Sequence, residues 1–178
     1  MRRLLESRRI KYFNIRERIF ILTFLRNRSL FNSLAEVMEG ENKVHTLIWL
    51  KATGALCQVQ AHPGYYHQLK NSQAVLYPNP DFQQVELDVI RTYPHVEDPK
   101  ARTKLHSQLR NVLVCFVKRN AKIGYFQGMN FIAAHLLSQM RNEEYAFWTL
   151  CQIIEQYLPL DYFSNFFGVV VDQKVLDE

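Results

Sequence analysis

Cysteine is scarce in this sequence, and the few cysteines do not cluster. Cys57, Cys115 and Cys151 lie far apart, and no CxxC pair occurs. A disulfide framework needs an even set of closely spaced cysteines, and a cysteine zinc site needs paired ligands. The sequence therefore predicts neither, and three free cysteines favour a reducing compartment, which we interpret as the cytoplasm.

Glycine and proline are also few, with six of each among 178 residues, while aromatic residues make up 13% of the chain. Disordered chains lack this much apolar surface. No stretch without aspartate, glutamate, lysine or arginine is longer than residues 123–140, which contain the polar residues Gln127, Asn130, His135 and Gln139. It is a poor membrane span. We expect one or at most two folded domains and no transmembrane helix.

Motifs that bind nucleotides, metals or an activated serine are missing. The sequence contains no GxxxxGK[ST], GxGxxG, HExxH or GxSxG. Its six histidines are scattered, and His135, within an apolar segment, is more typical of a core residue than of a metal ligand. We expect no cofactor and no metal of the chain's own, so that any nucleotide would arrive on a partner.

Net charge is absent from most of the chain. Residues 1–40 hold nine basic and four acidic residues, which accounts for the whole net charge of +5. The apolar run 19–25 is short for a signal peptide and is followed by arginines, and a transit peptide is only faintly indicated, so a solvated basic N-terminal extension is favoured. Such an extension allows peripheral contact with an anionic membrane. The neutral remainder gives no reason to expect nucleic acid.

Apolar spacing beyond this extension is helical. One stripe follows a helical face: Leu105, Leu109, Val112, Leu113, Phe116 and Val117. A second stripe precedes Pro159: Phe147, Cys151, Ile154 and Leu158. Residues 131–137 are apolar almost all round and predict a central, buried helix, whereas residues 82–91 predict a short helix with Asp81 as its cap. No strand pattern competes, so the predicted fold class is all-α.

Two polar islands stand in these apolar surroundings. Asp88 and Arg91 are three apart, so on a helix they share a face. They form either an ordinary surface ion pair or a carboxylate that directs a guanidinium. Gln127 lies between Gly124 and Gly128, just before the most apolar segment, and is either part of a helix cap or a side chain presented at a helix start.

Together the islands resemble the motif pair of the TBC domain, the catalytic module of Rab GTPase-activating proteins. Val85, Asp88 and Arg91 match IxxDxxR, with valine in place of isoleucine, and Tyr125 and Gln127 match YxQ. Similar segments surround them: Trp49 with Gly54-Ala55, Pro63-Gly64-Tyr65-Tyr66, Arg91-Thr92, Gln127-Gly128-Met129-Asn130-Phe131, Ala146-Phe147-Trp148 and Leu158-Pro159. The resemblance implies an all-α TBC domain over residues 41–178.

The resemblance also implies how such a domain acts in vesicle trafficking. It would bind a Rab-type small GTPase in the GTP-bound state and stimulate its hydrolysis of GTP. Arg91 would be an arginine finger and Gln127 a glutamine finger, with Asp88 orienting Arg91 and Tyr125 supporting the loop of Gln127. GTP and Mg²⁺ would belong to the partner, and hydrolysis would take place in the partner's active site. The expected location is cytoplasmic and peripheral on endomembranes.

The C-terminal end departs from the family pattern. The sequence stops at Glu178, after a stretch that several more helices follow in relatives. His45 also occupies the position where relatives carry an arginine. We therefore expect a domain that lacks its C-terminal helices. The alternative to catalysis is a Rab-binding or scaffold module without activity.

Overall fold

The longest helix, α8 (Pro99–Arg119), runs through the middle of the computed structural model, which describes residues 41–72 and 79–158. Asp98 caps it by accepting hydrogen bonds from the backbone N–H groups of Lys100 and Ala101, and Pro99 occupies the first helical position. The predicted stripe is confirmed, since five of its six side chains are buried: Leu109, Val112, Leu113, Phe116 and Val117. Leu105 packs partly buried against them.

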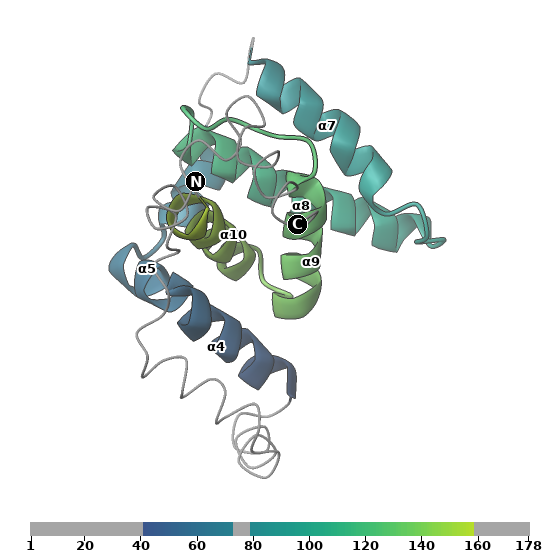
Figure 1. Cartoon of the computed structure of the whole chain (residues 1–178). Coiled ribbons are helices and arrows are strands. Elements are labelled where there is room, and N and C mark those ends of the chain that lie inside the picture. Colours follow the sequence, from purple (N-terminus) through teal and green to yellow (C-terminus); the bar gives the residue numbers. More distant parts are fainter. Residues whose placement is uncertain (1–40, 73–78, 159–178) are drawn as a thin grey trace, which may run out of the picture.

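Helices make up all the regular structure within the described ranges (Figure 1). In chain order they are α4 (Glu41–Thr53), α5 (Ala55–Ala61), α6 (Tyr65–Asn71), α7 (Pro80–Thr92), α8, α9 (Met129–Met140), α10 (Glu143–Gln152) and the π-helix η1 (Ile153–Tyr157). The all-α prediction is confirmed. The basic extension and the segment after Leu158 lie outside the described residues.

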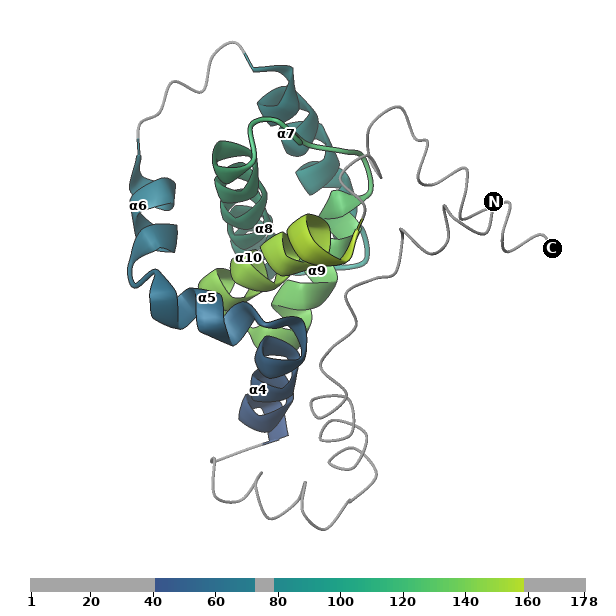
Figure 2. The same ribbon diagram turned by 60° about the vertical axis from the view of Figure 1, so that its left-hand side comes forward.

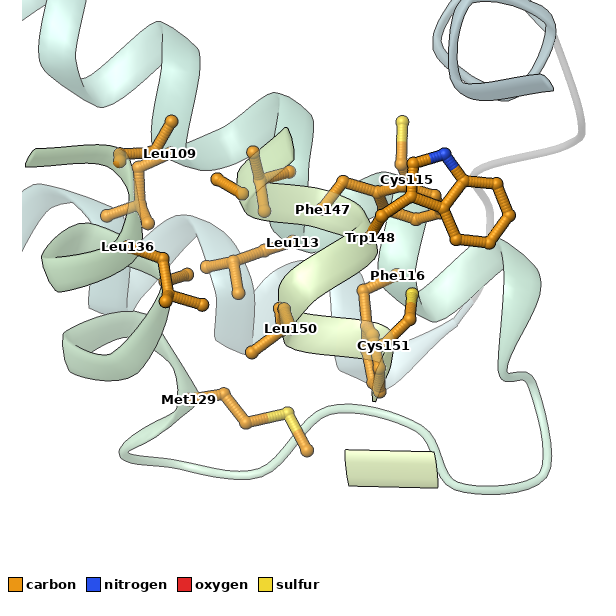
Figure 3. Packing of buried hydrophobic residues seen from close by; sticks show 14 of the residues in the cluster. Leu109, Leu113, Cys115, Phe116, Met129, Leu136, Phe147, Trp148, Leu150 and Cys151 are labelled. Carbon is orange, nitrogen blue, oxygen red and sulfur yellow. The ribbon is translucent and has the colours of Figure 1, made fainter. Parts of the chain in front are cut away.

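Helix α10 is the centre of the packing. It contacts α4, α5, α6, α8 and α9, and every residue from Ala146 to Gln152 is buried. Figure 2 shows α5 and α6 on one side of α8 and α10. Figure 3 shows Trp148 and Cys151 of α10 beside Phe116 of α8. Three residues of the second predicted stripe, Phe147, Cys151 and Ile154, are buried in the core, and Leu158 packs partly buried against it. The helical structure ends before Pro159, because the residue preceding a proline favours extended backbone such as that of Leu158.

Helix α9 corrects the expectation of a helix buried all round. Its inner face, which includes Ala133 and Leu136, is buried, but Phe131 is 62% and Ile132 37% exposed. His135 is also exposed and meets Trp49 edge to face, with ring centroids 6.5 Å apart, so it is no core residue. Helices α4, α7, α8 and α10 pack against α9, and they leave these three side chains outward.

Helix α7 is anchored by two buried valines, Val85 and Val89, and packs on α8 and α9. Its N-cap is Asn79, whose side chain accepts a hydrogen bond from the backbone N–H of Asp81. The prediction of Asp81 as the cap is therefore wrong by two residues, since Pro80 fits the first helical position and lets the helix start earlier. Asp81 instead lies in the first turn of the helix.

Buried or half-buried charges join the outer helices to the centre. Glu143 accepts hydrogen bonds from Tyr66, Lys70 and Asn111, which connects α10 to α6 and α8. Arg119 donates two hydrogen bonds to Glu155 of η1. No helix in the described part of the chain combines the length and the apolar character that crossing a bilayer requires.

Candidate functional site

The candidate site lies where the last turn of α7 meets the loop that leads into α9. Arg91 stands in that last turn, and Gln127 stands in the loop, two residues before Met129, the first residue of α9. Both side chains are exposed, and neither forms a hydrogen bond or ion pair with any residue in 41–72 or 79–158. A guanidinium and a carboxamide are therefore available to an outside molecule on this edge.

Asp88 faces the interior, one turn before Arg91. Its side chain is only 3% exposed. Oδ2 accepts a hydrogen bond of 2.9 Å from the Tyr125 hydroxyl, and Oδ1 accepts one of 3.2 Å from Nε2 of Gln84. The surface ion pair that the i, i+3 spacing allowed is not formed, because the carboxylate is turned toward the loop and no bond to the Arg91 guanidinium is present among the described residues.

Tyr125 is the loop residue that contacts Asp88. Burial raises the pKa of its phenol, and the hydrogen bond to Asp88 and the negative charge of that carboxylate raise the pKa further. The phenol therefore stays protonated and remains a donor at physiological pH. The structure thus brings Asp88 and Tyr125 together, and this contact fixes the loop to α7.

A second link joins the same two segments through Thr92 and Asn130, to which we assigned no role from the sequence. Asn130 is 2% exposed, and its Nδ2 donates to Oγ1 of Thr92 over 2.9 Å. The Thr92 hydroxyl in turn donates to the backbone carbonyl of Asp88 over 2.6 Å. Oδ1 of Asn130 accepts from the backbone N–H of Gly128 over 3.1 Å. Both residues lie in the family-like segments described above, but nothing in the sequence indicated that their side chains meet.

Two glycines shape the loop, as the sequence predicted. Gly124 has φ +71° and Gly128 has φ +103°, both in the left-handed region that glycine tolerates. Gly128 directly precedes α9, and the backbone N–H of Met129 bonds to the carbonyl of Phe126 over 3.1 Å. The resulting tight turn places Gln127 outside the core, at the start of α9.

Gly124 also lies against a neighbour. A Cβ at this position would lie 2.7 Å from Oδ2 of Asp81, which is closer than real contacts allow. Gly64 has nearly the same φ, +76°, but nothing within 4 Å of its Cβ position. We expect Gly64→Ala to lower the free energy of unfolding by about 1–2 kcal/mol through backbone strain alone. Gly124→Ala should cost about 1–3 kcal/mol more through the added overlap.

Urea denaturation of the two variants measures this difference. The control is Gly124→Ala combined with Asp81→Ala, in which the overlap is gone and the cost of the glycine change should return to that of Gly64→Ala. If Gly124→Ala and Gly64→Ala lower the free energy of unfolding equally with Asp81 intact, the overlap with Asp81 costs no stability, which contradicts the prediction.

Large apolar side chains flank the two exposed polar ones. Ile90, next to Arg91, is 63% exposed, and Phe131, at the start of α9, is 62% exposed. Leu87, one turn earlier in α7, is also exposed. No group of three or more histidine, cysteine, aspartate or glutamate side chains within the described residues is arranged to hold a metal ion. The edge combines polar and apolar groups in the way that a protein-binding surface does.

Known proteins resemble this chain in sequence and in fold. The profile of the Rab-GTPase-TBC domain family matches residues 42–178. The chain is 37% identical over 134 residues to human growth hormone-regulated TBC protein 1, a match that covers 74% of this chain and 39% of that protein. It is 40% identical over 121 residues to TBC1 domain family member 2B of Xenopus tropicalis, covering 67% of this chain and 13% of that protein.

Among solved structures, the RabGAP TBC domain of a Chlamydomonas flagellar protein has a similar fold. The TM-score is 0.59 with 23% sequence identity, and the match covers 84% of this chain and 52% of that one. This likeness supports the fold. The chain spans only 39% and 13% of the two curated relatives named above.

Proposed function

We propose that this chain, which belongs to the Rab-GTPase-TBC domain family, stimulates GTP hydrolysis by a Rab-family small GTPase in its GTP-bound state. The observation that carries the proposal is a pair of exposed side chains, Arg91 and Gln127, which bond to no described residue and stand on two segments that buried hydrogen bonds hold together. An edge of this kind can enter the partner's active site from outside.

Arg91 acts in this proposal as an arginine finger. Negative charge builds on the phosphate oxygens as the γ-phosphoryl group of GTP leaves, and a guanidinium placed against them stabilises that charge. The planar fork of donors fits phosphate oxygens better than a lysine ammonium does. Arg91 bonds to no described residue, so contact with the phosphates breaks no bond to the described part of the chain.

Gln127 acts as a glutamine finger that orients the attacking water, in place of the GTPase's own glutamine. A carboxamide can accept one hydrogen bond and donate another without carrying charge, which suits a neutral nucleophile. Asp88 and Tyr125 support both segments from below. Asp88 orients Arg91 through the helix turn that it fixes, since its carboxylate bonds Tyr125 and Gln84.

GTP and Mg²⁺ belong to the partner in this mechanism. The chain has no phosphate-binding glycine motif, so the chemistry takes place in the GTPase and this chain contributes two side chains. The basic residues of 1–40 would add electrostatic attraction to anionic endomembranes on the cytoplasmic side.

A single-turnover hydrolysis assay tests the function. The full chain is added to a panel of GTP-loaded Rab proteins, and phosphate release is compared with each intrinsic rate. Acceleration of at least one Rab by about 10³-fold or more is expected, the scale of an arginine finger. Binding to a GTP-bound Rab without faster hydrolysis would favour a non-catalytic Rab-binding module instead, and no effect and no binding across the panel would contradict the proposal.

A further inference from the structure

We infer that Thr92 and Asn130 are positioning residues that fix the distance and orientation of Arg91 relative to Gln127, an inference that rests on the proposed function. Thr92 directly follows Arg91, and Asn130 lies three residues after Gln127. Their side chains meet in the interior, where the Nδ2 group of Asn130 donates to Oγ1 of Thr92 over 2.9 Å. The bond therefore joins the end of α7, which carries Arg91, to the first turn of α9, which follows Gln127.

Each partner of this bond is fixed at its other end. The Thr92 hydroxyl uses its hydrogen for the carbonyl of Asp88, so its oxygen can only accept from Asn130. Oδ1 of Asn130 accepts from the backbone N–H of Gly128, the residue next to Gln127. A chain of bonds thus runs from the last turn of α7 to the turn that carries Gln127, and neither side chain can rotate without breaking it.

Burial makes this link sensitive to small changes. Thr92 is 6% and Asn130 2% exposed, so water does not replace a lost partner easily. The bond between Tyr125 and Asp88 joins the same segments at a second point. Two links between two segments fix their relative rotation as well as their separation, whereas the Tyr125 contact alone would leave the loop free to turn about it.

This link affects function because catalysis depends on the exact positions of the groups that contact the reacting atoms. A displacement of about 1 Å in a group that contacts the reacting atoms can cost about a hundredfold in rate. We therefore expect Thr92→Val, which removes the hydroxyl and keeps the shape, to lower the maximal rate of stimulated hydrolysis by about tenfold to a hundredfold, with the concentration of chain at half-maximal rate changed by less than about threefold.

Thr53 offers a matched control for loss of stability. Like Thr92, it is the last residue of its helix, it is 7% exposed, and its hydroxyl donates to the carbonyl four residues earlier, that of Trp49, over 2.8 Å. It lies in α4, its oxygen accepts only from the backbone N–H of Ala55 over 3.4 Å, and within the described ranges no hydrogen bond joins it to α7 or to the loop of Gln127. Thr53→Val should therefore lower the melting temperature as Thr92→Val does, while leaving the stimulated rate at the wild-type level. Thr92→Ser, which keeps the hydroxyl, should restore most of that rate.

The outcomes separate this inference from the proposed function. A slow Thr92→Val chain, with active Thr53→Val and Thr92→Ser chains, supports the positioning role. The inference is overturned if Thr92→Val has the wild-type rate, or if Thr53→Val loses as much rate as Thr92→Val does. Either result leaves the proposed function intact. A wild-type chain that accelerates no Rab overturns both.

Discussion

Replacing Arg91 by alanine is expected to lower the stimulated rate of GTP hydrolysis by about 10³-fold or more, while the melting temperature stays within about 1 °C of the wild type. The rate falls because the chain no longer supplies a guanidinium to stabilise the negative charge of the phosphate oxygens in the transition state. Folding is unaffected because the Arg91 side chain is exposed and bonds to no described residue. Single-turnover phosphate release and thermal denaturation measure the two effects.

Charge alone does not explain such a loss, and two variants separate charge from geometry. Arg91→Lys keeps the positive charge but loses the planar fork, so most of the loss should remain. Lys104→Ala removes one exposed positive charge from α8 and should leave the rate within about twofold, since rim charges change association modestly. A fully active Arg91→Ala chain would exclude the arginine-finger mechanism.

Replacing Gln127 by alanine is expected to lower the same rate by about 10²–10³-fold, the range seen when one polar group that acts on the transition state is removed. The loss should appear in the maximal rate, with binding of the GTP-bound partner little changed, because the carboxamide acts on the attacking water. Gln83→Ala, which removes an exposed glutamine side chain from α7, is the matched control and should be fully active.

The partner offers a sharper test of the Gln127 role. If Gln127 positions the water, a GTPase whose own catalytic glutamine is replaced by alanine should still respond to the wild-type chain and should not respond to Gln127→Ala. If this partner variant no longer responds to the wild-type chain, the GTPase's own glutamine orients the attacking water and Gln127 does not.

The helices could be predicted from the sequence because spacing alone defines a helical face. Leu109 and Phe116 share a stripe, and both are buried in α8. Spacing does not say which face a neighbour covers, and this is why α9 was expected to be buried all round although Phe131 and Ile132 point outward. The cap of α7 was misplaced for a local reason, since both Asn79 and Asp81 are good cap residues and only the position of Pro80 decides between them.

The site was only half accessible from the sequence. The motifs pointed to Asp88, Arg91, Tyr125 and Gln127, and the roles of these residues remain predictions. The contact between Asp88 and Tyr125, and that between Thr92 and Asn130, each join residues more than thirty positions apart. No periodicity within one segment encodes such a pairing, because it depends on how α7 and α9 pack. The i, i+3 spacing instead suggested a local ion pair that burial of Asp88 prevents.

The buried bonds beneath the two exposed side chains have a thermodynamic consequence. Complex formation ordinarily carries an entropic penalty when a loop must settle into one conformation, and that penalty is reduced when the loop is already settled. Here the turn around Gln127 is closed in the unbound chain by Tyr125, Asn130 and the Met129 amide. On binding, only the side-chain rotamers of Arg91 and Gln127 would have to be fixed. Recognition would therefore approach a lock-and-key encounter, with no change in the backbone.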